Sequence, residues 1–420
     1  MTFKESLDYL YGLQRFGIKL GLDNMQRLTK RLSALNKPLL CAHVAGTNGK
    51  GSVSALLAEI LIQSGLNVGL YTSPHLHCFT ERITVNSKPI PKCHVAQLVK
   101  SIRTQSEGVP LTFFEATTCL ALLYFEQKSV DFAIIETGMG GRLDATNVVN
   151  PGICLITPVS LDHQEHLGNS LSKIAHEKAG IIKQNVPVVL GRQSVDVLVE
   201  LEKVASERHA PVIRFNQDYH VKSECGKVSV EFLGEVVDNL TLALEGVHQT
   251  ENLGQAVAAA LKLREQGLPI TQTAIRAAAK SAHWPARLEW WQHKRQILLD
   301  VAHNEAGFLS LANYLNDQGI SKVSMVIALS GKRSPMEVLP PIKSLLGKMY
   351  AVPLSGQEHV PTASLALWAS QQGIDHIECT EPVEALRSAM MDLPPNEVLV
   401  ICGSIYLVSE IREFLRNNGR

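Results

Sequence analysis

The chain has 420 residues, which is enough for two or three domains that each bury a core. Lysine plus arginine number 40 and aspartate plus glutamate number 40, so the formal net charge is zero, which disfavours nucleic acid or an anionic membrane surface as a partner. Because no apolar stretch reaches the length of a membrane span and no signal-peptide pattern is present, we expect a cytoplasmic protein. The eight cysteines are scattered without a C-x-x-C pair, which predicts reduced thiols rather than disulfides or a zinc site.

Short continuous apolar runs alternate with helical stretches through the first half of the chain. The predicted strands are 39–45, 67–71, 132–135, 153–157 and 186–190. Residues 53–63 and 115–127 have helical periodicity. Continuous apolar strands separated by helices are typical of a doubly wound α/β sheet whose strands are buried on both faces.

The segment 215–250 differs, because its β-like runs alternate with turn residues and indicate a small antiparallel excursion. These runs are 220–222, 228–233 and 240–244, and a helix is predicted at 252–265.

An α/β pattern starts again near residue 296. Its predicted strands are 297–301, 323–328, 349–352 and 398–401, and its predicted helices lie near 305–317, 336–346, 382–391 and 405–416. One sheet with all of these strands would be unusually wide, so we expect two domains, residues 1–285 and 286–420. The hinge is expected within or just after 281–294.

A glycine-rich loop, GTNGKGS at residues 46–52, lies between a predicted strand and a predicted helix, which is the context that a phosphate-binding loop requires. Glycines let the backbone approach phosphate oxygens, and the helix N-terminus favours an anion. Lys50 is expected to reach the β- and γ-phosphates, and Ser52 to place a hydroxyl near the metal. The spacing departs from G-x-x-x-x-G-K-[ST], because Gly51 separates the lysine from the serine. A glycine-rich turn with an incidental lysine is the alternative.

The loop and seven further blocks resemble, in order, the folylpolyglutamate synthase family of the Mur ligase superfamily. The blocks are TSPHL with ERI (72–83), ETGMGGRLDATN (136–147), LDHQEHLG (161–168), HEKAGI (176–181), WPARLE (284–289), LDVAHN (299–304) and CGS (402–404). The resemblance covers nearly the whole chain. It implies a P-loop, Mur-ligase-like doubly wound central domain followed by a smaller Rossmann-like C-terminal α/β domain.

The resemblance implies an ATP-dependent ligase that joins L-glutamate to dihydropteroate and extends the glutamate tail of reduced folates. A carboxylate does not accept an amine directly, so ATP would give an acyl phosphate whose phosphate the amine displaces. The charge that develops on the phosphoryl group requires cations, which would be Lys50 and Mg²⁺. We expect a monomer whose partners are these small molecules, with neither nucleic acid nor membrane among them.

The resemblance also assigns roles to individual residues. The residues implied for ATP are Thr47, Asn48, Gly49, Lys50, Gly51, Ser52, Asn252, Arg287, Asp300 and His303. Those implied for the metal are Ser73, Glu136 and His163, and those implied for catalysis are Lys50, His163 and Lys178, the last carbamylated in the family. Those implied for the pterin are Ile18, Lys19, Leu20, Thr112, Phe113, Phe114, Glu115, Leu143, Asp144 and Ala145.

Taken singly, several of these residues have simpler interpretations. His163 more often bonds a loop backbone than Mg²⁺, and an unmodified Lys178 is more often a surface residue of a helix. Asn252 alone would indicate a helix cap, and Arg287 a solvated charge. Both phenylalanines at 113–114 could simply be core residues.

Three departures from the family pattern affect the glutamate and C-terminal sites. Glu305 replaces a proline, His166 replaces a tryptophan, and residues 330–333 match only loosely. The alternatives are a monofunctional folylpolyglutamate synthase, another Mur-type ligase, or a nucleotide switch without catalysis. A cell-wall Mur ligase normally carries a UDP-binding domain before its P-loop, and 45 residues leave too little room for one.

Overall fold

In a computed structural model of the chain, residues 1–17, 21–32, 38–292 and 296–418 are described. They form two compact units, Met1–Ala243 with Gln249–His283, and Leu244–His248 with Trp284–Arg420. The sequence did not predict that the short segment 244–248 packs with the second unit. The division into domains after residue 285 stays a proposal. Among the described residues, no helix combines the length and the apolar content that crossing a bilayer requires.

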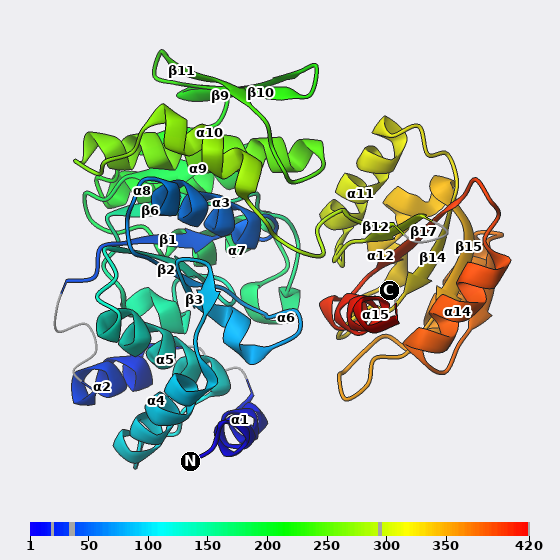
Figure 1. The fold of residues 1–420 in the computed structure, drawn as a ribbon, viewed down its shortest axis with the longest axis horizontal. Helices are drawn as coiled ribbons and strands as arrows, with labels where there is room; N and C mark the ends of the chain where they lie inside the picture. The colour runs from blue at the N-terminus through cyan, green and yellow to red at the C-terminus, as the bar shows by residue number, and fades with distance from the viewer. Residues whose placement is uncertain (18–20, 33–37, 293–295, 419–420) are drawn as a thin grey trace. The chain divides into compact units, whose positions relative to one another are not determined.

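An eight-stranded sheet forms the centre of the first unit (Figure 1). Its order is β4-β3-β2-β5-β1-β6-β7-β8, in which β3 pairs antiparallel with both neighbours and the other pairs are parallel. The strands are β1 (Cys41–Ala45), β2 (Val68–Tyr71), β3 (Ile83–Val85), β4 (Lys88–Pro89), β5 (Phe132–Glu136), β6 (Ile153–Ile156), β7 (Val188–Leu190) and β8 (Val212–Arg214). The five predicted strands and the doubly wound class are confirmed. The sequence did not predict β3, β4 and β8, which are two or three residues long and not fully buried.

Helices cover both faces of this sheet. They are α1 (Phe3–Gly12), α2 (Asp23–Arg31), α3 (Lys50–Gln63), α4 (Lys92–Gln105), α5 (Phe113–Gln127), α6 (Gln164–Leu167), α7 (Leu171–Ala179), α8 (Val195–Glu207), α9 (Val247–Glu265) and α10 (Gln272–Ser281), with 3-10 turns η1 (Leu13–Phe16), η2 (Phe79–Arg82) and η3 (Ala145–Val148). One buried cluster includes Leu28, Val99 and Leu120, from α2, α4 and α5. Another includes Ile174 and Leu201, from α7 and α8. The first cluster also contains Cys41 and the second Ala45, so both pack against β1, the strand that leads into the predicted phosphate loop.

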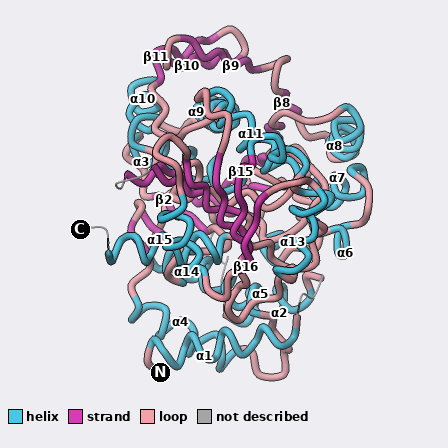
Figure 2. The backbone as a smooth tube through the Cα atoms, turned by 90° about the vertical axis from the view of Figure 1, so that its right-hand side faces the viewer, coloured by secondary structure: helices cyan, strands magenta, loops and turns pink. Residues whose placement is uncertain are grey.

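The antiparallel excursion is a three-stranded sheet of β9 (Tyr219–Glu224), β10 (Lys227–Phe232) and β11 (Glu235–Leu240). Figures 1 and 2 both show it lying over α9 and α10. Side chains of α10 bond to β11, since Gln272 donates to the carbonyl of Val236 and Arg276 to that of Asp238. The predicted run 240–244 is wrong: the third strand is β11, which ends at Leu240.

The second unit is built on a six-stranded sheet of order β12-β13-β17-β14-β15-β16, in which only the β12–β13 pair is antiparallel. Its strands are β12 (Glu289–Gln292), β13 (Gln296–Leu299), β14 (Val323–Ile327), β15 (Leu346–Ala351), β16 (Asp375–Glu378) and β17 (Val398–Cys402). Its helices are α11 (Glu305–Asp317), α12 (Pro335–Val338), α13 (Thr362–Gln371), α14 (Pro382–Asp392) and α15 (Ile405–Asn418), with the 3-10 turn η4 (Pro340–Leu345).

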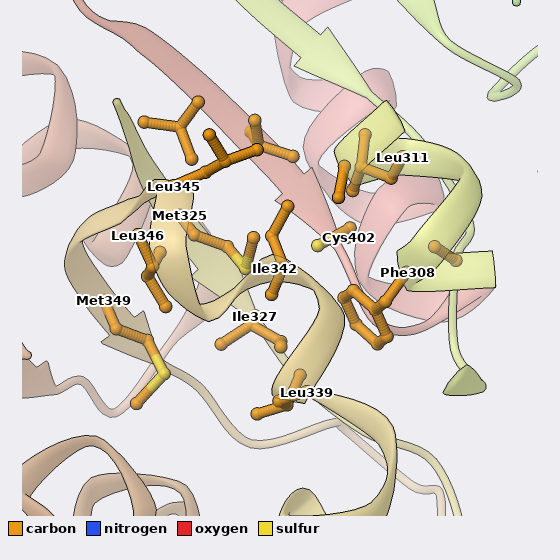
Figure 3. Close-up of a cluster of buried hydrophobic side chains, with 14 of the residues drawn as sticks. Phe308, Leu311, Met325, Ile327, Leu339, Ile342, Leu345, Leu346, Met349 and Cys402 are labelled. Carbon is orange, nitrogen blue, oxygen red and sulfur yellow. The ribbon is translucent and has the colours of Figure 1, made fainter. Parts of the chain in front are cut away.

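The predicted helix at 336–346 is wrong, because the chain forms α12 and then η4. Pro340 and Pro341 lack the amide hydrogens that an α-helix needs in its interior. The η4 turn is nevertheless part of the core (Figure 3), where Ile342 lies in one buried cluster with Phe308 of α11 and Ile327 of β14. This packing fixes the sheet whose carboxyl ends carry the LDVAHN and CGS blocks.

Candidate active site

The loop 46–52 connects β1 to α3, so the strand–loop–helix context that the sequence predicted is present. β1 ends at Ala45, and α3 begins at Lys50 after Gly49, which is left-handed with φ of 89°. Gly46 has φ of 148°, and a Cβ there would lie 1.8 Å from Thr157 Oγ1, so no side chain fits. The Lys50 ammonium lies over the loop and donates to the carbonyls of Gly46 and Thr47, both at 3.1 Å. The loop is thus shaped as a cradle at a helix N-terminus.

The segment 157–160 supports this loop from β6. The backbone amides of Thr47 and Asn48 donate to the Pro158 carbonyl at 3.0 and 3.3 Å. The Thr47 hydroxyl donates to the Ser160 carbonyl and accepts from the Ser160 amide, both at 3.0 Å. Any shift of 157–160 would therefore move the phosphate loop.

Lys178 lies beneath the same loop. It comes from α7, is 4% exposed, and donates a 2.7 Å hydrogen bond to the carbonyl of Gly46. Burial, together with the nearby Lys50 charge, lowers the pKa of Lys178 to about 7. The surface interpretation of Lys178 is excluded by this burial and by the hydrogen bond to Gly46.

Glu136 and Ser73 meet where β5 and β2 end. The Ser73 amide donates to Glu136 Oε2 at 3.2 Å, and Glu136 is 4% exposed. The hydroxyl oxygen of the next residue, Thr137, is buried without a hydrogen-bond partner in the described structure. His163 immediately precedes α6 and has a left-handed backbone with φ of 50°, and its Nε2 lies 3.9 Å from Asp162 Oδ2. Carboxylate and hydroxyl oxygens suit a hard cation such as Mg²⁺.

No group of three or more histidine, cysteine, aspartate or glutamate side chains among the described residues is placed to hold a metal. The predicted metal ligands are Ser73, Glu136 and His163, and the Ser73 hydroxyl is not one of these four side-chain types. Their assignment to a metal stays a prediction.

The predicted pterin residues come from three segments of the chain, 18–20, 112–115 and 143–145. Ile18, Lys19 and Leu20 lie outside the described residues. Thr112 and Glu115 form a capping box at the start of α5, with the Thr112 amide and hydroxyl donating to Glu115 Oε2 at 2.7 and 2.9 Å.

The two phenylalanines point to different neighbours. Phe113 is half-buried and stacks on Tyr11 with centroids 5.5 Å apart, and the Arg82 guanidinium lies 5.2 Å from its ring. Phe114 stacks on Tyr71 at 6.1 Å. An aromatic wall beside a cation is therefore present at Phe113. Tyr11 and Arg82 were missed as pocket candidates, although Arg82 stands in the ERI block.

Asp144 is fully engaged within its own loop. One carboxylate oxygen accepts from the amides of Gly138 and Met139 at 3.0 Å, and the other from the Thr146 amide at 3.0 Å and hydroxyl at 2.5 Å. The neighbouring Leu143 carbonyl accepts from Gly21 at 3.4 Å, and Ala145 is buried. In this structure Asp144 organises the loop after Glu136, and its contact with a pterin stays a prediction.

Asn252 lies against the phosphate loop. It is in the interior of α9, which excludes the helix-cap interpretation, and a Cβ on Gly49 would lie 2.6 Å from its Oδ1. Gln249, one turn earlier, accepts a 3.0 Å hydrogen bond from Asn252 Nδ2 and is itself buried. The α9 helix therefore presents an oriented amide to the loop that the sequence assigns to ATP.

In the second unit, Arg287 precedes β12, and Asp300 and His303 follow β13. Asp300 accepts from the amides of Leu288 and Ala302 at 2.9 and 2.8 Å, which joins the WPARLE and LDVAHN blocks. His303 Nδ1 donates to the Val301 carbonyl at 2.8 Å, so this hydrogen bond sets the tautomer of the ring. The Ser330 and Ser404 hydroxyls are 2.7 Å apart, which brings the loosely matching segment beside the CGS block.

Comparison with known proteins places the chain in a family. Residues 44–260 match the Mur ligase middle domain, and residues 288–416 match the C-terminal domain of dihydrofolate synthetase. The chain is 33% identical over 432 residues to a dihydrofolate synthase/folylpolyglutamate synthase of Bacillus subtilis, with 99% of each chain covered. It belongs to the dihydrofolate synthase/folylpolyglutamate synthase family.

Other members of the family are similarly related. A folylpolyglutamate synthase of Lacticaseibacillus casei is 32% identical over 432 residues, with 99% of each chain covered. The structure of E. coli FolC in complex with DHPP and ADP superposes with a TM-score of 0.91 at 30% identity, covering 100% of this chain and 99% of that one. A bifunctional enzyme of Yersinia pestis complexed with AMPPNP and Mn ion gives 0.89 at 30% identity, covering 99% and 98%. This chain is accordingly a Mur-type ligase of the folate-linked family.

Proposed function

We propose that this family member, acting in the cytoplasm, joins L-glutamate to dihydropteroate and to the glutamate tail of reduced folates, using ATP and Mg²⁺. The observation that carries the proposal is the assembly around loop 46–52, where Lys50 lies on the loop and Lys178 is hydrogen-bonded to its first residue. A lysine ammonium at a phosphate cradle suits a reaction that transfers a phosphoryl group, and Lys178 holds the first residue of that cradle in place.

The loop and its neighbours fit a nucleoside triphosphate. The Lys50 ammonium donates to two loop carbonyls, those of Gly46 and Thr47, and it can turn from them to phosphate oxygens. Asn252 is held by Gln249 beside Gly49, where it would orient the nucleotide. In the second unit, the Arg287 guanidinium offers paired donors that match phosphate oxygens. We propose that these groups bind ATP for attack by the substrate carboxylate.

Glu136, Ser73 and His163 would hold Mg²⁺, since their donors include the oxygen ligands that this ion prefers. When bound, the ion would supply positive charge that offsets the charge of the transferring phosphoryl group. Glu136 is held through Oε2 by the Ser73 amide, so its carboxylate is oriented before any ion arrives. A manganese ion accompanies AMPPNP in the Yersinia pestis relative.

Lys178 is proposed to be carbamylated. Its pKa of about 7 leaves a large fraction of neutral amine, which is the form that adds to CO₂. The amine nitrogen would bond to the CO₂ carbon and release one proton to solvent, leaving an anionic carbamate. The Lys50 ammonium, whose charge already depresses the pKa of Lys178, would then face an anion instead of a cation.

The pterin is proposed to lie against the aromatic wall of Phe113, with Tyr11 and Arg82 beside it. A flat ring with hydrogen-bonding edges needs such a wall and a few oriented polar groups. E. coli FolC binds DHPP. The predicted contacts at Thr112, Phe114, Glu115 and 143–145 belong to the same proposal.

The test supplies dihydropteroate or tetrahydrofolate as the only acceptor, each with ATP, Mg²⁺ and glutamate, and identifies the product by mass. Glutamate addition to both acceptors is expected. Extension of tetrahydrofolate alone would establish the second candidate, a monofunctional folylpolyglutamate synthase, which the Lacticaseibacillus casei relative favours. ATP hydrolysis that is independent of both substrates would contradict the ligase proposal.

A further inference from the structure

Arg287 lies in a turn whose backbone is left-handed on both sides of it. The φ angle is +59° at Ala286 and +47° at Leu288, and both residues are buried. A left-handed backbone is costly for any residue with a Cβ, and it is a clear outlier for a bulky side chain such as leucine. Such a turn persists only where the surrounding contacts hold it.

Two carboxylates provide those contacts. Glu289 Oε2 accepts a 2.7 Å hydrogen bond from the Ala286 amide, and Asp300 Oδ2 accepts a 2.9 Å bond from the Leu288 amide. Each left-handed residue therefore has its own amide fixed by a charged acceptor. The Arg287 side chain is itself bonded to this turn, since its Nη1 donates to the Ala286 carbonyl at 3.1 Å.

Glu289 is in turn held by Arg412 of α15. Arg412 Nε donates to both carboxylate oxygens at 3.1 and 2.9 Å, and Nη2 donates to Oε1 at 2.9 Å. The pair is mostly shielded from water, with 11% of the arginine side chain and 19% of the glutamate side chain exposed. A bidentate pair with this little exposure has a fixed geometry, so it can transmit an orientation that a solvated pair cannot.

We propose that Arg412 is a positioning residue for the nucleotide: through Glu289 it holds the turn Ala286 to Leu288 and so orients Arg287. The inference rests on the proposed function, in which Arg287 contacts phosphate oxygens. A guanidinium bonds phosphate through a rigid planar fork, so rotating the turn loses the contact even though Arg287 is still present. Arg412 itself touches neither substrate nor phosphate in this scheme.

The competing explanation is that Arg412 only fastens α15 to β12. Both explanations predict a loss of stability when Arg412 is replaced. Only a positioning role predicts that the effect of replacing Arg412 on the KM for ATP depends on the presence of Arg287. A double-mutant cycle separates the two, because residues that act through one another are not additive.

The experiment compares Arg412→Met, Arg287→Met and the double variant by the KM for ATP, the kcat and the melting temperature. Arg287→Met is expected to raise the KM for ATP about 10- to 100-fold, the range for one lost charge-assisted contact. Arg412→Met should raise it on the order of tenfold with a smaller change in kcat. In the Arg287→Met background, Arg412→Met should leave the KM unchanged while still lowering the melting temperature.

Arg276→Met is the matched control, because Arg276 also bonds a carboxylate, that of Asp238, but on the three-stranded sheet. It should not alter the KM for ATP. If Arg412→Met does not fold, two milder variants replace it. Arg412→Lys keeps the positive charge but not the planar guanidinium, and Glu289→Gln keeps an acceptor for the Ala286 amide. Each should give a KM for ATP between that of the wild type and that expected for Arg412→Met.

The inference would be overturned if Arg412→Met and Arg287→Met had additive effects on the KM for ATP. It would also be overturned if the KM for ATP were unchanged in folded Arg412→Met or in Arg287→Met. A wild-type chain that ligates neither acceptor would instead refute the proposed function, so the two failures are distinguishable.

Discussion

The side-chain nitrogen of Lys178 lies 2.7 Å from the carbonyl oxygen of Gly46, which joins α7 to the first residue of the phosphate loop. The neighbouring Glu177 reinforces this joint, because its carbonyl accepts from the Arg142 amide at 2.7 Å and its carboxylate from the Arg142 side chain at 2.8 Å. The blocks GTNGKGS, GGRLDATN and HEKAGI thus meet at one place. A buried amine at their junction affects both stability and chemistry.

Lys178→Met is expected to stabilise the fold at pH 7 in CO₂-free buffer and to lose most of that gain at pH 10. Burial lowers the pKa of Lys178 from 10.5 to about 7, so between these values the unfolded chain binds a proton that the folded chain does not. The wild type therefore gains stability as pH rises through this window, whereas below pH 7 the full penalty, on the order of a few kcal/mol, remains.

Urea unfolding at several pH values measures this slope. The exposed Lys203, on α8, gives the control Lys203→Met, which should not change it. Carbon-13 bicarbonate then tests the modification: a carbamate resonance is expected in the wild type and should be lost in Lys178→Met. A pH-independent difference between the two proteins would show that Lys178 is charged in the fold.

Lys50→Ala is expected to reduce kcat by about two orders of magnitude, close to 3 kcal/mol, as for the loss of one oxyanion donor. The melting temperature should change little, because the hydrogen bonds of Lys50 to Gly46 and Thr47 lie within a loop that the segment 157–160 already supports. Turnover with saturating ATP measures the effect. A folded variant with near-normal turnover would remove Lys50 from the proposed phosphate site.

How far the sequence predicts this site depends on the kind of feature. Continuous burial of β1 and β5 produces apolar runs, so the strands that carry the loop 46–52 and Glu136 were found. The third strand of the small sheet was misplaced, because β11 contains three polar residues of EVVDNL and lacks a continuous apolar run. The break between α12 and η4 follows from two prolines, whose effect the helical periodicity concealed.

The site residues divide in the same way. The residues next to Lys178 in the sequence do not indicate that it is buried. It contacts Gly46, which lies 132 residues away in the chain. No local pattern reports such a contact. The engagement of Asp144 by Gly138, Met139 and Thr146 is local but depends on loop conformation, which residue types alone do not determine.

Glu136→Gln is expected to shift the Mg²⁺ concentration for half-maximal activity upward and to lower the maximal rate, because a neutral amide is a poorer ligand for a hard cation. The amide oxygen can still accept from the Ser73 amide, so the loop geometry should be kept. Titration with Mg²⁺ at saturating ATP checks this outcome. Glu59→Gln, at a half-buried carboxylate of α3, is the control, and an unchanged titration curve in Glu136→Gln would contradict the assignment.

Gln193→Met is expected to raise the KM for ATP several-fold and to leave the KM for dihydropteroate unchanged. Gln193 Nε2 donates to the carbonyls of Ile156 and Thr157 at 3.3 and 3.0 Å, and its Oε1 accepts from the Val159 amide at 3.0 Å. One side chain therefore fixes three backbone groups at the start of segment 157–160. That segment supports Thr47 and Asn48, so its displacement should loosen the phosphate loop.

Methionine keeps the length of Gln193 but removes all three hydrogen bonds, each worth about 1 kcal/mol, so a modest loss of stability is also expected. The exposed Gln97 of α4 gives the control Gln97→Met, which should change neither KM. Gln193→Glu sharpens the test, since a carboxylate cannot donate to the two carbonyls at neutral pH but can donate to one of them when protonated. Its KM for ATP should therefore fall toward the wild-type value as pH is lowered. Equal effects on the KM values for ATP and dihydropteroate would indicate general loosening of the first unit rather than support of the phosphate loop.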